Sequence, residues 1–430
     1  MQNIKGEKMK KKVLVFPCGS EIGLEIHRAL KYNKDYELIG GSSVEDHGMF
    51  VYELYIDGIP NVDDENFISH INELVEEHNI DYLYPAHDSV VLKFSQFSDM
   101  LKAKVVTSNY FTCDICRSKR KTYDYFKDII LVPKMYKKEQ IKESDYPLFL
   151  KPDVGQGSKG TKKISNSKDL NYFYTDESQL ILEYLPYEEY TIDCFTDYLG
   201  NLKYCSARKR KRISNGISVS SEYVENPEFF DIANKINDNL KLNGSWFFQL
   251  KENVKHELCL LEIAPRIAGT MEFQRSFGVN LPLLNLYNSD KKDVEIIKNK
   301  YSCLMDRALE TKYKLDYQYE YIYVDLDDVI VQDDKVNYMV LAYLYKSINE
   351  NKKIILITRH YQDPLLTLKK HNIANIFKEI IHINDKNSLK SEYIKHKNAI
   401  FIDDSHKERQ DVYKKCNIPV FDVNMIDVLF

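Results

Sequence analysis

The alternation of hydrophobic and polar positions over residues 11–110 predicts a small open parallel sheet flanked by helices. Short apolar runs are separated by segments in which apolar residues recur at helical spacing, and such runs are typical of strands that are buried on both faces. The first run is followed by a turn at Cys18–Gly23 and a helix that ends near Tyr32. The predicted strands are Lys12–Phe16, Tyr36–Ile39, Leu54–Ile56, Asp81–Tyr84 and Lys104–Val106.

The turn after the first predicted strand contains Gly19 and Gly23. This spacing differs from the G-x-G-x-x-G pattern of dinucleotide-binding folds, and no acidic residue ends the second predicted strand. The sequence therefore argues against NAD. We interpret the glycines as turn residues beside a substrate cleft.

Two further changes of pattern divide the chain into three predicted domains. Residues 111–312 contain more runs of antiparallel character, and after the polar stretch Thr311–Gln318 a hydrophobic strand, Tyr319–Val324, restarts the alternation of strand and helix. We predict a small Rossmann-like α/β domain at 11–110, an α+β domain at 111–312 and a parallel-sheet α/β domain at 319–430. A length of 430 residues agrees with two to three domains.

Composition narrows the classes of function. The chain is 43% hydrophobic and 29% charged, as globular proteins are, and its net charge of −5 gives no general attraction to nucleic acid or to an anionic membrane. The basic run Arg208–Arg212 is local, and it leaves a nucleic-acid patch as a minor alternative. No apolar stretch approaches the roughly 18–20 residues of a membrane-spanning helix. The lysine-rich start, Met1–Lys12, lacks a signal-peptide pattern, so we expect a cytoplasmic location.

The cysteines give little evidence of metal or redox chemistry. Cys113 and Cys116 form a single C-x-x-C pair without a second pair. Buried thiols on a helix explain such a pair better than zinc or redox chemistry does.

A glycine-rich loop after a predicted strand suggests phosphate binding. The strand carries Lys151, and the loop that follows contains Gly155, Gly157 and Gly160 interleaved with Gln156, Ser158 and Lys159. Glycines let backbone N–H groups approach phosphate oxygens, and lysine supplies the opposite charge. The loop is not a Walker A motif, because no G-K-[ST] opens a helix.

Two further segments of this region carry acidic residues at strand ends. One strand ends at Glu183, and Glu188 and Glu189 begin the next; in isolation, an ordinary acidic turn explains them. In the other segment, Gly244–Leu250 and Leu258–Thr270 form a predicted hairpin that brings Gln249 and Glu262 together. A carboxylate after a buried strand favours a metal site, because a buried glutamate is rare unless it is paired or metal-bound.

Together these motifs resemble the ATP-grasp superfamily, in particular its carbamoyl-phosphate-synthetase-like and amino-acid-ligase-like branches. The resemblance covers about Lys11 to Lys312 and rests on the order of the motifs. They are Arg117–Ser118–Lys119, Lys151 with the 155–160 loop, the ILEYL and EEYTIDCF segments (181–185 and 188–195), the Arg208–Arg212 run, Gly216, FFQL and LEIAPRIAG.

The resemblance implies an ATP and Mg²⁺ site. Lys119, Lys151 and the glycine loop would hold the phosphates, Glu183, Tyr184 and Leu185 the adenine, and Glu189 the ribose. Gln249 and Glu262 would bind Mg²⁺, and Arg266, with Arg208 or Arg210, would stabilise the transferred phosphoryl group. One departure is Ala264, at a position where the family usually has an asparagine ligand, which implies that a second Mg²⁺ is weakly held or absent.

The last domain places acidic residues after two predicted strands. Tyr321–Ile330 contains a strand ending in Asp325, Asp327 and Asp328, and Ala399–Ile402 is followed by Asp403 and Asp404. Between them a strand ends in Thr358, and Lys390 opens a predicted helix, Lys390–His396. The carboxyl ends of parallel strands meet at one edge of a sheet, so these groups should converge on a Mg²⁺ and nucleophile site.

This domain resembles the HAD superfamily of hydrolases. The resemblance implies that Asp325 is the nucleophile, Asp327 the general acid and base, and Thr358 and Lys390 the phosphate-binding groups. Asp325, Asp327, Asp403 and Asp404 would form the Mg²⁺ site, and Lys386 is a rival to Lys390. The single helix that fits between Ile330 and Lys353 leaves no room for a large cap. An uncapped site suggests a bulky substrate, or the ATP-grasp part as a lid.

The resemblances imply a bifunctional enzyme. One part would be an ATP-dependent ligase that joins a carboxylate and an amine through an acyl-phosphate, and the other part would be a phosphatase. Its partners would be these small molecules and a phosphorylated substrate, with no membrane, and a homo-oligomer is left open. A second hypothesis keeps only the phosphatase active beside a nucleotide-binding regulatory module. A third, prompted by the uncapped domain and the basic run, is processing of nucleic-acid ends.

Overall fold

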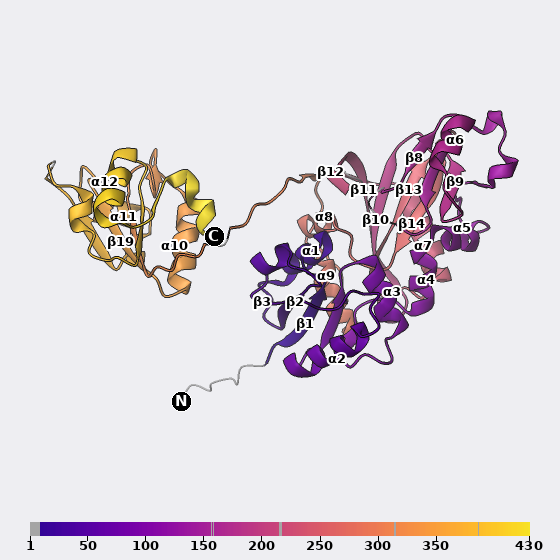
Figure 1. The fold of residues 1–430 in the computed structure, drawn as a ribbon, viewed down its shortest axis with the longest axis horizontal. Coiled ribbons are helices and arrows are strands. Elements are labelled where there is room, and N and C mark those ends of the chain that lie inside the picture. Colours follow the sequence, from indigo (N-terminus) through magenta and orange to yellow (C-terminus); the bar gives the residue numbers. More distant parts are fainter. Residues whose placement is uncertain (1–8, 156, 158, 215–216, 314, 386) are drawn as a thin grey trace. The chain divides into compact units, whose positions relative to one another are not determined.

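The computed structural model describes residues 9–155, 157, 159–214, 217–313, 315–385 and 387–430 (Figure 1). The chain divides into two units, Met1–Ala308 and Leu309–Phe430, which we call unit 1 and unit 2.

Unit 1 begins with the predicted parallel sheet, in the order β3-β2-β1-β4-β5. Both of its faces are buried. Val13 and Val15 pack into one core together with α1 and α9, whereas Leu14 and Phe16 pack into another with α2 and α3. This burial explains the continuous apolar runs. The elements are β1 (Lys11–Phe16), α1 (Glu21–Leu30), β2 (Tyr36–Gly41), β3 (Leu54–Ile56), α2 (Phe67–His78), β4 (Tyr82–Pro85), α3 (Asp88–Gln96) and β5 (Lys104–Val105).

The glycine turn of this sheet binds an acidic side chain of its own chain. Asp46 follows β2 and accepts hydrogen bonds from the backbone N–H of Gly19 (3.2 Å) and of Gly48 (2.8 Å). A Cβ atom at Gly19 would lie 2.1 Å from Cγ of Asp46, so the turn requires glycine. As the sequence indicated, β2 ends without an acidic residue, and Asp46 reaches the turn because the loop after β2 folds back. Asp46 occupies the N–H group that a dinucleotide phosphate would need in such a turn.

The rest of unit 1 contains two antiparallel sheets. The first has the order β6-β9-β7-β8 and the second β14-β13-β10-β11-β12-β15. Cys113 and Cys116 are buried in α4, as expected. The helices are α4 (Tyr110–Arg117), α5 (Lys119–Phe126), α6 (Ser167–Phe173), α7 (Pro227–Asn239), α8 (Glu272–Ser276) and α9 (Leu281–Ser289). The strands are β6 (Met135–Tyr136), β7 (Leu148–Pro152), β8 (Lys162–Ile164), β9 (Gln179–Glu183), β10 (Glu189–Thr196), β11 (Leu202–Ser214), β12 (Ile217–Val224), β13 (Gly244–Glu252), β14 (Leu258–Ala264) and β15 (Leu304–Asp306).

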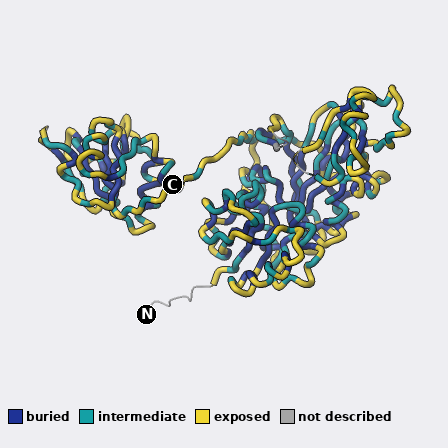
Figure 2. Tube along the Cα trace, viewed as in Figure 1, coloured by how far each residue is buried: buried dark blue, intermediate teal, exposed yellow. Residues whose placement is uncertain are grey.

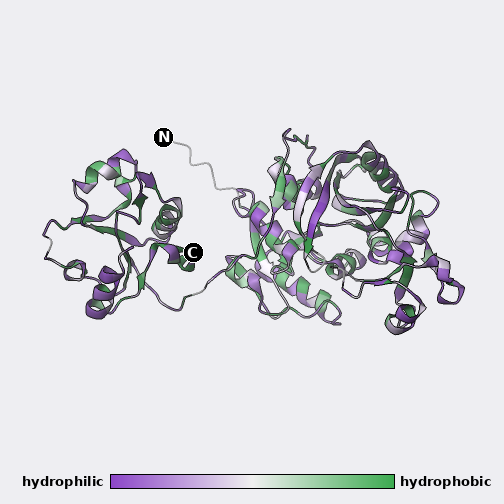
Figure 3. Ribbon diagram, turned by 90° about the horizontal axis from the view of Figure 1, so that it is seen from above, coloured by the Kyte–Doolittle hydropathy of each residue, from purple (hydrophilic) through white to green (hydrophobic). Residues whose placement is uncertain are grey.

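Unit 2 is a parallel sheet with the order β20-β19-β16-β21-β22. Alternate residues of its central strand enter two separate cores, Ile322 and Val324 on one face and Tyr323 on the other. In Figures 2 and 3 the strands of this unit are buried and largely hydrophobic, whereas its outer helices carry exposed polar residues. The elements are β16 (Tyr321–Val324), α10 (Tyr338–Asn349), β19 (Lys353–Thr358), α11 (Pro364–Lys370), β20 (Glu379–His382), β21 (Ala399–Ile402), α12 (His406–Cys416) and β22 (Val420–Phe421).

Between β16 and β19 lie a small hairpin and one helix. The hairpin pairs β17 (Val331–Gln332) with β18 (Lys335–Val336) through a turn at Asp333 and Asp334, which both have positive φ as a tight hairpin turn requires. The described residues of this segment therefore form no large cap. The helix predicted at Lys390–His396 was wrong in length, because only the short 3-10 helix Lys390–Tyr393 forms there.

Candidate active sites

The first site is a pocket lined by both antiparallel sheets of unit 1. Lys151 comes from β7, Gln249 from β13, Glu262 from β14 and Lys119 from the first turn of α5. Ser118 caps α5, and its hydroxyl also donates to the Asp153 carboxylate at 2.8 Å, which ties this helix end to the glycine loop. The lining residues are Lys119, Pro133, Phe149, Lys151, Pro152, Gly155, Gly157, Lys159, Thr161, Leu182, Glu183, Tyr184, Leu185, Glu189, Arg210, Gln249, Lys251, Leu261 and Glu262.

Two lysine amino groups in this pocket contact only neutral atoms of the described residues. The Nζ atom of Lys151 donates to the Tyr123 hydroxyl at 2.9 Å and to the Leu261 carbonyl at 3.4 Å. The Nζ atom of Lys119 donates to the carbonyls of Asp153 and Gly155, both at 3.2 Å. Burial lowers the pKa of both groups, and that of Lys151 to about 8. Buried charges are normally paired, so this pocket suits an anionic ligand.

Gln249 and Glu262 lie directly opposite one another in the β13–β14 hairpin, as predicted. The register shifts between Gln249 and Leu250, and both Gln249 and Glu262 line the pocket. A carboxylate and an amide oxygen beside two lysines are a donor set that fits Mg²⁺ on a polyphosphate, which needs only one or two protein ligands.

Glu189 is held by two cations. Its carboxylate forms ion pairs with Arg210 and, at 3.2 Å, with Lys251. Burial by itself would raise the pKa of Glu189, but Arg210 and then Lys251 outweigh it and lower that pKa. Glu183, which also lines the pocket, accepts a hydrogen bond of 3.0 Å from the backbone N–H of Lys134.

Most of the predicted nucleotide-site residues line this one pocket. Gly160 does not belong to the lining, and Gln156, Ser158 and Gly216 lie outside the described residues. Phe149 and Lys251 also line the pocket and were not predicted from the sequence. Period-two alternation could have found both, because each lies two residues from a predicted site residue on the same strand.

Arg266 and Arg208 are engaged elsewhere. Arg266 donates to both Asp88 oxygens, at 2.6 and 2.8 Å, and does not line the pocket. Burial would raise the pKa of Asp88, but Arg266 holds it at about 2. Arg208 is fully buried and donates to both Asp193 oxygens, at 2.9 and 3.1 Å, so the prediction that it contacts a phosphoryl group was wrong.

The basic run is not a free cationic patch. Its residues belong to β11, and each one forms an ion pair. The partners are Asp193 for Arg208, Glu188 for Lys209, Glu189 for Arg210, Glu222 for Lys211 and Asp306 for Arg212.

Comparison with known proteins agrees with this geometry. A model of the family "ATP-grasp in the biosynthetic pathway with Ter operon" matches residues 175–308. The fold is also that of a biotin carboxylase domain, an N5-carboxyaminoimidazole synthetase and an L-amino acid ligase. The larger part of the chain has the ATP-grasp fold. No curated protein matches the chain.

Three solved structures illustrate the likeness of the ATP-grasp fold. The biotin carboxylase domain of 2-oxoglutarate carboxylase from Hydrogenobacter thermophilus, with MgADP and bicarbonate, is 15% identical and has a TM-score of 0.58 over 69% of this chain and 74% of that one. The ADP complex of N5-carboxyaminoimidazole synthetase from Staphylococcus aureus is 15% identical, with a TM-score of 0.58 over 70% and 84%. The L-amino acid ligase from Bacillus licheniformis is 16% identical, with a TM-score of 0.53 over 67% and 75%.

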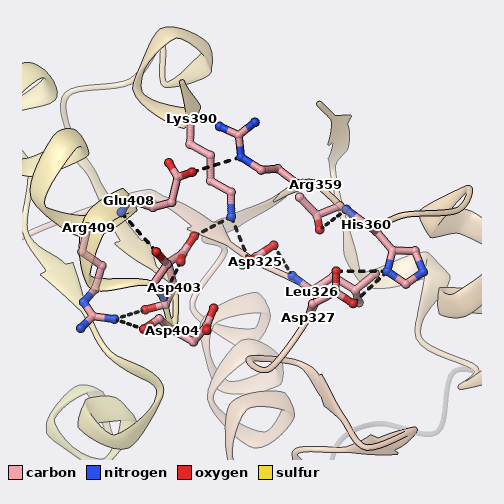
Figure 4. Close-up of polar contacts among 12 residues, drawn as sticks. Asp325, Leu326, Asp327, Arg359, His360, Lys390, Asp403, Asp404, Glu408 and Arg409 are labelled. Carbon is pink, nitrogen blue, oxygen red and sulfur yellow. Dashed lines mark hydrogen bonds and ion pairs between the residues drawn. The ribbon is translucent and has the colours of Figure 1, made fainter. Parts of the chain in front are cut away.

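The second site lies in unit 2, at the carboxyl edge of its sheet. Carboxylate oxygens of Asp325, Asp403 and Asp404 all lie within 4.8 Å of one another. The Nζ atom of Lys390 lies 2.8 Å from Asp325 and 2.6 Å from Asp403 (Figure 4). Three carboxylates this close repel each other unless a cation joins them, so the donor set fits a divalent metal ion beside the lysine.

Burial and mutual repulsion shift the pKa values of this cluster. Burial, and then the Asp325 charge, raises the pKa of Asp403 to about 6. Burial also raises the pKa of Asp325, against the opposing effect of Lys390. The pKa of Lys390 is raised as well, because the two aspartates outweigh the effect of its burial.

Asp327 does not belong to the carboxylate cluster, contrary to the predicted metal role of its side chain. Its oxygens lie 2.8 and 3.1 Å from Nδ1 of His360 (Figure 4). Thr358 is fully buried, and its hydroxyl accepts a hydrogen bond of 3.2 Å from the backbone N–H of His360. Lys386 lies outside the described residues.

Two arginines that were not predicted from the sequence organise the second site. Arg359 forms a 3.0 Å ion pair with Glu408 and donates to the carbonyl of Ser388 at 2.6 Å, close to Lys390 in the chain. Arg409 donates to the carbonyls of Asp403 and Asp404, at 2.6 and 2.7 Å (Figure 4). The spacing of these arginines from the aspartates in the sequence does not indicate such a role, because contacts between side chains and backbone carbonyls depend on how the loops fold.

A membrane-spanning helix is not among the described elements. None of the helices between residues 9 and 430 that the structure describes combines the length and the apolar character that crossing a bilayer requires.

Proposed function

We propose that unit 1 is a Mg-ATP-dependent ligase that joins a carboxylate to an amine. The observation that carries this proposal is the pair of lysines, Lys119 and Lys151, whose amino groups contact only neutral atoms of the described residues. Gln249 and Glu262, which pair with each other in the hairpin, line the same pocket. The solved structures of this fold that contain ADP or MgADP support ATP and Mg²⁺ as its ligands. The amino acid ligase among them supports the reaction class.

The pocket residues would divide the work of binding and positioning. Lys119, Lys151 and the backbone N–H groups of Gly155 and Gly157 would hold phosphate oxygens. Glu183, Tyr184 and Leu185 would meet the adenine, and Glu189, steadied by its two cations, the ribose. Gln249 and Glu262 would hold Mg²⁺, which when bound would neutralise charge on the phosphates.

The proposed reaction has two steps. An oxygen of the substrate carboxylate attacks the γ-phosphorus, the bond to the β-phosphate oxygen breaks, and an acyl-phosphate and ADP form. The amine nitrogen then attacks the acyl carbon and loses a proton, and inorganic phosphate leaves. The chain contributes mainly positioning and charge stabilisation.

We propose that unit 2 is a Mg-dependent phosphohydrolase of HAD type. An oxygen of Asp325 would attack the phosphorus of a phosphomonoester, the bond to the alcohol would break, and Asp327 would protonate the alcohol. Asp327 would then accept a proton from the water that attacks the phosphoryl group on Asp325, releasing phosphate. Asp403 and Asp404 would complete the metal site, and Thr358 and Lys390 would hold the phosphoryl oxygens. The convergence of these groups supports the proposal.

One experiment tests both activities. ATP consumption is measured over pooled carboxylates and amines, and phosphate release over pooled phosphate esters, for the wild type, Glu262→Ala and Asp325→Asn. We expect ADP formation that needs both substrates and is lost in Glu262→Ala, and phosphatase activity that is lost in Asp325→Asn. Glu257→Ala and Asp328→Asn serve as matched controls. Glu257 is exposed, and Asp328 is exposed with φ of 57°, which asparagine tolerates.

An alternative is a phosphohydrolase with a regulatory nucleotide-binding unit. Ala264 favours it, since this buried alanine offers no second ligand beside Glu262. The alternative predicts that unit 1 binds ADP in a Glu262-dependent way, while no combination of carboxylate and amine increases ATP consumption. Amine-dependent ADP formation would exclude it.

A further inference from the structure

We propose that His360 is a positioning residue, which holds the Asp327 carboxylate in the orientation that proton transfer requires. This inference rests on the phosphohydrolase function proposed for unit 2. The ring atom Nδ1 of His360 lies 2.8 Å from one oxygen of Asp327 and 3.1 Å from the other (Figure 4).

His360 is itself fixed from three sides. Its Nε2 atom lies 2.9 Å from the Thr367 hydroxyl, its carbonyl oxygen lies 2.8 Å from Nε2 of His382, and its backbone N–H donates to Thr358 at 3.2 Å. These contacts come from α11, from the end of β20 and from the end of β19. The Thr367 contact restrains the ring, and the two backbone contacts restrain the residue that carries it, so the ring can orient a partner.

The Thr367 contact is compatible with a proton on Nδ1, the ring nitrogen that faces Asp327. If the Thr367 hydroxyl donates to Nε2, that nitrogen is the acceptor of a neutral ring and the proton lies on Nδ1. Nδ1–H then points at the Asp327 carboxylate. In this arrangement the ring N–H of His360 donates to the Asp327 carboxylate and so orients it.

Exposure separates the roles of the two residues. The side chain of Asp327 is 50% exposed, whereas that of His360 is 6% exposed. Asp327 is therefore the more accessible of the two side chains to a substrate. Among the described residues, His360 is the hydrogen-bond partner of the Asp327 carboxylate, so without the ring this short exposed side chain would rotate freely.

The two chemical steps depend on this orientation to different degrees. In the first step the alcohol leaves from phosphorus and takes a proton from Asp327. This proton transfer is important when the leaving group is a strongly basic alkoxide, and has little effect when it is nitrophenolate, a stable anion. In the second step the attacking water gives a proton to Asp327 whatever alcohol has left. Loss of orientation should therefore slow both steps for an alkyl phosphate but only the second for an aryl phosphate.

The test uses the full chain with Mg²⁺ and two probes, glycerol phosphate and p-nitrophenyl phosphate, in rapid-quench measurements. For His360→Leu we expect turnover of glycerol phosphate to fall about a hundredfold. With p-nitrophenyl phosphate we expect a burst of nitrophenolate equal to the enzyme concentration, followed by slow turnover. Asp327→Asn should give the same pattern, and the double variant should be no worse than either single variant.

Two further variants separate positioning from a general structural role. His360→Asn keeps an N–H near the place of Nδ1 and should restore most of the activity. His371→Gln changes a histidine of the same region that faces Asp334 instead, and should behave as wild type.

The outcomes are distinguishable. Wild-type kinetics in His360→Leu, or an equal loss with both probes and no burst, would overturn the positioning role while the phosphohydrolase stands. The absence of Asp325-dependent turnover in the wild type would overturn the phosphohydrolase and this inference with it.

Discussion

The amino group of Lys151, which lines the pocket of unit 1, donates a 2.9 Å hydrogen bond to the hydroxyl of Tyr123. Both side chains are buried, and among the described residues the hydrogen-bond partners of the lysine are neutral oxygens. Burial therefore leaves this lysine with a pKa of about 8. A nucleotide phosphate would supply the missing opposite charge.

We expect nucleotide affinity to fall as the pH rises through 8. The sign follows from the pKa of Lys151, which is about 8 in the free protein and higher once a phosphate stabilises the charged form. Affinity is then constant below pH 8 and falls above it by up to about tenfold per pH unit, because binding requires uptake of a proton. Calorimetric titration with Mg-ADP between pH 6.5 and 9.5 measures this.

Lys151→Arg is the control for this pH dependence. Arginine stays charged throughout that range, so the slope should be reduced. Tyr123→Phe removes a hydrogen-bond acceptor from Lys151 and should move the fall to lower pH. Equal wild-type affinity at pH 7 and pH 9.5 would contradict the prediction.

Ala264→Asn should strengthen Mg²⁺ binding in unit 1. Ala264 lies two residues from Glu262 on β14, so an amide oxygen there would point to the same face of the strand. We expect ADP to bind at several-fold lower Mg²⁺ concentration, measured by titrating Mg²⁺ at fixed ADP. Because Ala264 is buried, some loss of stability should accompany this gain.

Ala268→Asn separates the two effects of that substitution. Ala268 is buried in the same core, so its variant should lose stability without any change in Mg²⁺ dependence. If both variants bound ADP at a lower Mg²⁺ concentration, the gain would not come from coordination of Mg²⁺ by the new side chain.

Asp403→Asn should stabilise unit 2 at neutral pH. The pKa of Asp403 is about 6 in the folded chain, above its ordinary value of 3.8. The free energy of unfolding therefore falls as the pH rises from about 4 to 6, since the folded state must then bury a second negative charge beside Asp325. Asparagine removes that penalty.

The measurement is thermal unfolding of the full chain in EDTA at pH 4 and pH 7. We expect Asp403→Asn to raise the Tm of unit 2 by about 4 °C or more at pH 7, and to have little effect at pH 4. Asp404→Asn, at an exposed position, is the control. A lower Tm at pH 7 would mean that the ion pair with Lys390 outweighs the repulsion.

Arg208→Met should destabilise unit 1 by about 3–5 kcal/mol, because it leaves the Asp193 carboxylate buried without its cation. Arg212→Ala breaks an ion pair whose side chains are 61% and 57% exposed, so it should change stability by no more than about 0.5 kcal/mol. Urea unfolding can be followed by the fluorescence of Trp246, the single tryptophan, which is fully buried in β13. Equal effects of the two variants would contradict the prediction.

Features that depend on neighbours along the chain could be predicted. The parallel strands follow from apolar runs buried on both faces, and Asp325 and Asp403 converge because each follows a strand of the same sheet. The pairing of Gln249 with Glu262 follows from one hairpin. In these cases the position of a residue along the chain determines where its side chain lies, because the geometry of a strand or a hairpin is regular.

Contacts between distant segments could not be predicted. Asp88 pairs with Arg266, and Asp46 accepts a hydrogen bond from the Gly19 turn. Arg208 pairs with Asp193 and is therefore not available to a ligand. The orientation of Asp327 toward His360 belongs to the same class. The residue types of these pairs are visible in the sequence, but their partners are chosen by packing of the sheets and loops. Burial makes an unpaired charge costly, so only the tertiary structure decided which charges remain available for ligands.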